Sequence, residues 1–145
     1  DFESSNSFIR SSSEGLSNNT KGAALSAEKT AVRKLQDKIQ FLIKSVGETY
    51  ESNVIDGQKA SYTETVDNIS RTISKGVLSN VKTICSKTTQ DNQTSIYKHY
   101  TCIEISSEIL IKKVEENLSR EARLDIESNR NKFREIFNEE LNKQR

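Results

Sequence analysis

The sequence of 145 residues contains no methionine, one histidine and two cysteines. Because no methionine is present, we expect the natural start and any leader to lie outside the printed residues. Metal and catalytic sites usually need histidine, cysteine and carboxylate side chains that converge, and one histidine, His99, offers little for this. The sequence also has no glycine-rich phosphate loop and no nucleophile elbow. It therefore predicts no catalytic residues, no metal site and no cofactor.

Long apolar runs and an excess of one charge are lacking too. The longest apolar stretches are fragments such as 41–43 and 109–111, whereas a helix that spans a bilayer needs about 18 or more apolar residues. The 22 basic residues nearly cancel the 21 acidic ones and leave a net charge of +1. Nucleic-acid binding is therefore not expected, and Lys82, Lys87 and Lys98 would be the candidate contacts for it.

Residues 1–22 are rich in polar residues, and seven of them are serines. They have few apolar anchors, namely Phe2, Phe8, Ile9 and Leu16. This composition is typical of a partly flexible leader, and a short first strand over residues 7–13 that ends at Gly15 is an equal alternative. Residues 23–145 are predicted to form a single domain, because a chain of this length is in the common size range of one domain.

The first helix is predicted over residues 23–46. Apolar residues recur there at steps of four and three, which places them on one face of a helix. They are Ala27, Ala31, Leu35, Ile39, Leu42 and Val46. Gly47 is placed to end this helix, since glycine adopts the left-handed turn that follows many helices.

A second, shorter helix is predicted over residues 61–74, with Gly76 closing it. Its apolar residues follow the same spacing and are Tyr62, Val66, Ile69, Ile73 and Val77.

Residues 81–88 and 95–105 are rich in β-branched and aromatic residues, which predicts an antiparallel hairpin with its turn at 90–93. With Gln90 opposite Gln93, one face holds Val81, Thr83, Cys85, Ile96, Tyr100 and Cys102. The other face then holds Ile84, Tyr97, His99, Ile103 and Ile105. Both faces are partly apolar, and a two-stranded ribbon is marginal by itself. We therefore expect each face to lie against a helix or against a second copy of the chain.

This register separates the two cysteines. Cys102 lies four positions past the residue opposite Cys85, an offset of roughly 13 Å, whereas a disulfide needs Cα atoms within roughly 7 Å. Buried free thiols are the favoured interpretation; a disulfide, which needs a longer loop, and a reactive or metal-binding thiol are the alternatives. His99 and Cys102 point to opposite faces of the strand, so His99 is expected to be structural.

A long last helix is predicted from Ser106 or Ser107 onward. Its apolar stripe consists of Ile111, Val114, Leu118, Ala122, Ile126, Phe133, Ile136, Phe137 and Leu141. No apolar residue occurs in 127–132, so the helix either breaks there and folds back or continues. If it continues, about 38 residues span roughly 57 Å, and the stripe around Phe133 and Phe137 would pack on a neighbouring subunit.

Four segments resemble the Lpp-twenty-type family of small Gram-negative outer-membrane lipoproteins. They are GAALSAEKTAVRKLQDKI (22–39), ISKGVLSNVKTICSKTT (73–89), IYKHYTCIEIS (96–106) and RLDIESNRNKFREIFNEEL (123–141). The resemblance implies an envelope location, a lipid on a cysteine upstream of Asp1, and a first strand in SFIRSSSEG (7–15). The expected fold class is α+β, with a small curled antiparallel sheet of this strand and the hairpin packed on a long first helix, followed by a long C-terminal helix.

We therefore expect a non-enzymatic cell-envelope protein, at the periplasmic face of the outer membrane or the cell surface, that acts through protein contacts. Its expected partners are a second copy, through the hairpin and C-terminal helix, and other envelope proteins; the membrane is reached only through the lipid anchor. The alternative is a ligand-binding module with a small apolar pocket between the sheet and first helix, near Tyr97, Tyr100 and Ile103. An enzyme that uses Cys85 or Cys102 is the least expected function.

Overall fold

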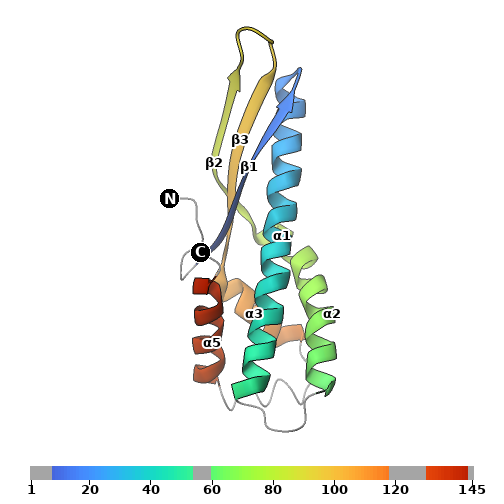
Figure 1. Cartoon of the computed structure of the whole chain (residues 1–145), viewed down its shortest axis with the longest axis vertical. Helices are drawn as coiled ribbons and strands as arrows, with labels where there is room; N and C mark the ends of the chain where they lie inside the picture. The colour runs from blue at the N-terminus through green and yellow to red at the C-terminus, as the bar shows by residue number, and fades with distance from the viewer. Residues whose placement is uncertain (1–7, 54–59, 118–129, 144–145) are drawn as a thin grey trace.

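The computed structural model describes residues 8–53, 60–117 and 130–143, with side chains described for 8–50, 68–117 and 130–143. The elements in chain order are β1 (Phe8–Ser17), α1 (Thr20–Asn53), α2 (Ala60–Gly76), a 3-10 helix (Val77–Asn80), β2 (Lys82–Gln90), β3 (Tyr97–Ser106), α3 (Ser107–Asn117) and α5 (Arg130–Lys143). The fold is α+β, as the sequence predicts. Figure 1 shows that α1 runs along most of the molecule, with the sheet beside its first half and the other helices around its second half.

The sheet has three antiparallel strands in the order β1-β3-β2. Residues 8–17 form the first strand, and β3 lies in the centre of the sheet. On the face of the sheet that packs on α1, the buried side chains are Ile9, Ser11, Ser13, His99, Thr101, Ile103 and Ile105. Small serine and alanine side chains meet near the hairpin end, so little apolar surface is buried there.

The backbones of α1 and β1 approach each other closely at Gly15. A Cβ atom at this position would collide with the Ala23 carbonyl oxygen and the Ala27 backbone nitrogen, and it would lie 2.9 Å from the Cβ of Ser26. The Ser11 hydroxyl also donates to the Ala31 carbonyl at 2.7 Å. Since only the smallest side chains allow such a separation, the alanine spacing of α1 and the glycine of β1 together define this half of the molecule.

The helix α1 continues past Gly47 to Asn53, so the predicted end at Gly47 is wrong. The physical reason is Tyr50, which extends the apolar stripe by one turn, is fully buried, and packs edge-on against Phe133 with 5.5 Å between ring centroids. Glycine inside a helix costs only about 1 kcal/mol, and burial of a large aromatic side chain outweighs that.

The hydrophobic core lies between the second half of α1, the helices α2, α3 and α5, and the near end of the sheet. The predicted stripes are confirmed wherever side chains are described. The buried members are Ala27, Ala31, Leu35, Ile39, Leu42, Val46, Ile69, Ile73, Val77, Ile111, Val114, Phe133, Ile136, Phe137 and Leu141. The other predicted members, at 62, 66, 118, 122 and 126, lie outside the described side chains.

The last part of the chain is not one straight helix, because two ion pairs join residues of α3 and α5 that are far apart in the sequence. The Arg134 guanidinium donates to both carboxylate oxygens of Glu108 at 2.9 Å, and Arg130 lies 3.6 Å from Glu115. Residues 26 positions apart in a continuous helix would be roughly 39 Å apart. The predicted break at 127–132 falls partly outside the described residues, which resume at Arg130.

Phe133 and Phe137 are fully buried within the chain itself. They therefore do not form the overhanging stripe that was predicted to pack on a second subunit. The alternative interpretation, a chain that folds back on its own core, is what the structure has. The prediction that the C-terminal helix mediates oligomerisation therefore loses its main support. Contacts with a second copy through the hairpin stay a prediction.

The hairpin is present, but its register differs from the predicted one. Gln90 pairs with Tyr97 instead of Gln93, and the loop spans residues 91–96. The Asp91 carboxylate accepts hydrogen bonds from the backbone of Gln93 (2.8 Å) and Thr94 (3.3 Å), and the Asp91 carbonyl accepts one from Ser95 (2.9 Å). These bonds close a helical turn that ends at Ser95 with φ of 60°, which lengthens the loop by four residues.

Candidate functional site

The three strands and the first turns of α1 form an arm that extends beyond the other helices (Figure 1). Its end is formed by the β1–α1 connection and the hairpin loop 91–96. The Asn19 side chain caps α1 there and accepts a hydrogen bond from Gly22 N–H at 2.6 Å, as expected of asparagine at a helix start. This end of the arm holds the candidate site.

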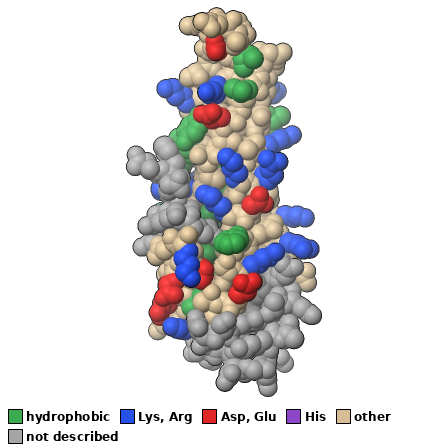
Figure 2. Space-filling view, viewed as in Figure 1, with side chains coloured by type: hydrophobic (Ala, Val, Ile, Leu, Met, Phe, Trp, Pro, Cys, Tyr) green, Lys and Arg blue, Asp and Glu red, His purple; other side chains and the backbone are tan. Residues whose placement is uncertain are grey.

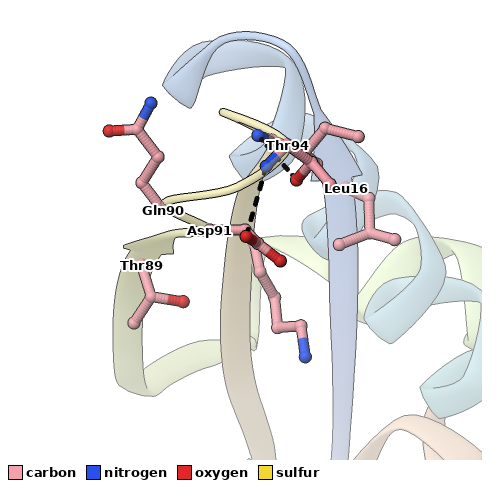
Figure 3. Close-up of a pocket in the computed structure, with 7 residues that line it drawn as sticks. Leu16, Thr89, Gln90, Asp91 and Thr94 are labelled. Atoms are coloured by element: carbon pink, nitrogen blue, oxygen red, sulfur yellow. Dashed lines mark hydrogen bonds between the residues drawn. The ribbon is translucent and has the colours of Figure 1, made fainter.

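A pocket of about 440 Å³ lies at the end of the arm (Figure 3). Two of its lining residues are apolar and unusually exposed: Leu16 is 62% exposed and Ile96 is 41% exposed. The other lining residues are Thr89, Gln90, Asp91, Thr94 and Lys98. Figure 2 shows hydrophobic side chains near this end of the molecule with charged side chains beside them. The site therefore combines an apolar wall with a polar rim.

The charged residues of the pocket have different roles. Among the residues that the structure describes, Lys98 forms one long ion pair, with Glu14, 3.9 Å between Nζ and Oε2. Both side chains are about half exposed, so this pair is weak. The carboxylate of Asp91 is occupied by the backbone N–H groups of the loop, as the dashed line in Figure 3 shows for Thr94. Lys98 can therefore serve a ligand or partner, whereas Asp91 holds the loop in shape.

His99 is buried on the helix-facing side of β3 and contacts two hydroxyl groups of β2. Its Nε2 lies 3.0 Å from Ser86 Oγ, and its Nδ1 lies 2.6 Å from Thr88 Oγ1. A serine beside an imidazole resembles a nucleophile and its base, but in a triad the second ring nitrogen is oriented by an acidic group. Here that partner is a threonine hydroxyl, which favours a structural role for His99.

Cys85 and Cys102 form a disulfide with their Cα atoms 5.0 Å apart. The favoured prediction of free thiols is therefore wrong, and the reason is the longer loop, which moves Cys102 opposite Cys85. The predicted separation of Cys102 and His99 on opposite faces agrees with the structure: Cys102 is bonded on one face, while His99 faces Ser86 and Thr88 on the other. No thiol of the two cysteines is left for chemistry.

The predicted pocket near Tyr97, Tyr100 and Ile103 stays a prediction. Ile103 belongs to the hydrophobic core, and the two tyrosines are half-buried. The pocket at the arm end is lined by none of these three residues. A sequence signal for it exists only in part, since Leu16 and Ile96 are apolar residues beside turn residues, and their proximity depends on the register.

Within the described ranges 8–53, 60–117 and 130–143, no three His, Cys, Asp or Glu residues gather as a metal site would require. In the same part of the chain, no helix combines the length and the hydrophobicity that crossing a bilayer requires.

Comparisons of the chain with protein-family models, with curated proteins and with solved structures gave no match.

Proposed function

We propose that this chain is a non-enzymatic cell-envelope protein that works through contacts with other proteins, and that the end of the arm is its contact surface. The observation that carries the proposal is the exposure of Leu16 and Ile96 around one pocket. Single exposed apolar residues are common, whereas grouped ones mark interaction surfaces. Leu25 in the first turns of α1 is 51% exposed and adds apolar surface at the same end of the molecule.

The envelope location is supported by the disulfide and by the resemblance to outer-membrane lipoproteins. Disulfides persist in oxidising compartments such as the bacterial periplasm and are rare in the cytosol. The bond between Cys85 and Cys102 therefore favours the periplasmic face of the outer membrane or the cell surface. A lipid on a cysteine upstream of Asp1 would hold the protein there.

The absence of an enzymatic activity is proposed from the chemistry of the described residues. Both nitrogens of His99 are engaged by hydroxyl groups, and both cysteines are in the disulfide. The buried Glu140 is likewise occupied, because Thr49 and Lys143 donate to its carboxylate at 2.8 and 3.1 Å. These groups stabilise the structure, and no acid, base and nucleophile converge among the side chains that the structure describes.

The first partner expected at the arm end is a second copy of the chain. Wild-type protein at about 100 μM, a concentration suited to weak contacts, should show a mass above the 16.4 kDa of one chain in light scattering. The double substitution Leu16→Ser and Ile96→Ser should return the mass to that of one chain, because it removes the apolar wall. Stability should change by less than about 1 kcal/mol, since both residues are exposed.

Phe41→Ser is the matched control for this experiment. Phe41 is 64% exposed on α1, so the substitution removes exposed apolar surface that lies away from the hairpin loop. It should leave the oligomer intact. A wild-type protein that has the mass of one chain at this concentration would refute self-association, and an equal effect of Phe41→Ser would refute the arm end as its site.

A second function, binding of a small amphiphilic ligand, is favoured by the pocket itself. Its volume of about 440 Å³ lies within the roughly 300–1,000 Å³ range of ligand sites. Leu16 and Ile96 could contact an alkyl chain, and Lys98 could bind a carboxylate. Titration with octanoate should then shift the backbone amide resonances of Thr89 and Thr94, and Lys98→Gln should weaken binding by about two- to fivefold, as for other exposed ion pairs. Shifts spread over α1 and α5 instead would contradict this site.

A further inference from the structure

The outer edge of β2 carries backbone groups that no strand pairs with among the described residues. The Asp91 N–H donates to the Ile96 carbonyl at 2.9 Å, and this bond sets the alternation of the antiparallel ladder. In that alternation Cys85, Lys87 and Thr89 direct their N–H and C=O groups toward β3. The N–H and C=O groups of three other residues point away from β3, and these residues are Ser86, Thr88 and Gln90.

The opposite edge of the sheet is closed by the chain itself. Lys38 donates from Nζ to the Arg10 carbonyl at 2.6 Å, and Lys34 donates to the Ser12 carbonyl at 3.2 Å. Lysines are a common means of blocking an edge strand. The two edges therefore differ in accessibility. Lysines of α1 bind two carbonyls at the β1 edge, whereas β2 lies at the side of the sheet away from that helix (Figure 1).

Unlike β1 and β3, the strand β2 has no buried apolar side chains. Every residue of this strand is exposed except Cys85, which is half-buried. A covalent bond fastens it to β3 on one face, through Cys85 and Cys102, and His99 fastens it on the other face through the hydroxyls of Ser86 and Thr88. Two of the three residues with outward backbone groups are therefore fixed directly, and a fixed edge lowers the entropy cost of binding.

The charge of the edge indicates the chemistry of its partner. β2 contains Lys82 and Lys87 and no acidic residue. Lys87 pairs with Tyr100, so its side chain lies on the face opposite His99, whereas Ser86 and Thr88 present hydroxyls on the His99 face. A strand added at this edge would place its residues alternately beside Lys87 and beside these hydroxyls.

We propose that the outer edge of β2 binds an extended segment of another protein, which carries acidic residues at alternate positions and joins the sheet as a fourth strand. Main-chain hydrogen bonds would give the affinity and the alternating side chains the specificity, as in other cases of strand addition. The proposal goes beyond the contacts of the arm end, because it depends on backbone groups of β2 instead of the side chains of Leu16 and Ile96.

The test uses the full chain and a nine-residue peptide of alternating Thr and Glu with blocked ends. The readout is hydrogen exchange of single backbone amides by NMR. Peptide should slow the exchange of Ser86, Thr88 and Gln90, whose N–H groups point outward, and leave Lys87 and Thr89 unchanged, since β3 already protects them. A peptide with the same side chains and a methyl group on every backbone nitrogen should not bind, because it has no donors.

Two kinds of substitution distinguish the contribution of the backbone to peptide binding from that of the side chains. Thr88→Pro removes one outward N–H and should weaken peptide binding by about tenfold, the effect of one lost hydrogen bond, whereas Thr88→Val keeps that N–H, loses only the hydroxyl and its contact with His99, and should bind the peptide more tightly than Thr88→Pro. Gln90→Pro is a second variant of the first kind, in case Thr88→Pro does not fold. Lys87→Gln should weaken binding by about two- to fivefold, an effect that salt should also produce.

Three results would overturn the proposal. The first is equal affinity of Thr88→Pro or Gln90→Pro and the wild-type chain for the Thr-Glu peptide. The second is equal affinity of wild type for a Thr-Lys peptide, which would remove the acidic specificity. The third is slow hydrogen exchange of the Ser86, Thr88 and Gln90 amides without any peptide. If dilution of the protein abolished this protection, the edge would be paired with a second copy of the chain. The double substitution at Leu16 and Ile96 should leave peptide binding intact, so that failure of the arm-end contacts and failure of this proposal are distinguishable.

Discussion

Phe133→Ala should lower the free energy of unfolding by about 3–5 kcal/mol, the usual effect of truncating a fully buried phenylalanine. The Phe133 ring has no exposed surface and contacts the rings of Tyr50 and Phe137, with centroids 5.5 and 6.4 Å away. Its loss leaves a cavity between α1 and α5 that large rings cannot fill by small movements. Urea unfolding should show a lower midpoint with an unchanged slope.

Phe41→Ala is the matched control, because it makes the same chemical change at a side chain that is 64% exposed. Its effect should stay within about 0.5 kcal/mol. If both variants lost equally little stability, α5 would not be docked on α1. The stripe around Phe133 would then again be available to a second subunit, so the comparison decides between the folded-back chain and the overhanging helix.

The helices could be predicted from the sequence wherever one apolar stripe determines one buried face. The stripe from Ala27 to Val46 is an example, because the 3.6-residue period alone assigns these positions to the same side. The end of that helix could not be predicted in the same way. Gly47 has a local preference to stop the helix, but Tyr50 finds its partner Phe133 more than 80 residues later in the sequence, and no local pattern records that contact.

The two strands of the hairpin could be predicted, but their register could not. Composition marks residues 90–93 as a turn, whereas the loop length depends on how many N–H groups the Asp91 carboxylate and carbonyl collect. Because the loop is four residues longer than predicted, Cys102 lies opposite Cys85 and forms a disulfide with it. The predicted register keeps the two cysteines apart. The contacts of His99 with Ser86 and Thr88 depend on the same register, so no local pattern predicts them.

The arm-end pocket was missed for a related reason. Leu16 and Ile96 come from β1 and the hairpin loop, and they meet only because β3 pairs with both outer strands. Their apolar character could be read from the sequence, but their exposure could not, since isolated apolar residues beside turns are as often buried. Sites built from one short segment can be predicted locally, and this one is built from the ends of three strands.

Replacement of both cysteines, Cys85→Ala with Cys102→Ala, should lower the free energy of unfolding by about 3 kcal/mol. The bond closes a loop with a sequence separation of 17 residues, and a loop of this size restricts the unfolded chain by about that amount. The melting temperature should fall by roughly 10 °C for a chain of this length. Thermal unfolding followed by circular dichroism measures the change, and a reducing agent should lower the stability of wild type but not of the variant.

Removal of the disulfide should destabilise β2 before it destabilises the rest of the domain, because β2 has no buried apolar side chains. Without the disulfide, the strand is held chiefly by its ladder with β3 and by the contacts of its hydroxyl groups with His99. Amide exchange of Lys87 and Thr89, whose N–H groups point to β3, should therefore accelerate at temperatures where the amides of Leu35 and Ile39 in the core are unaffected. Equal acceleration in both places would mean that the disulfide stabilises the domain as a whole and does not specifically position the edge of β2 for a partner.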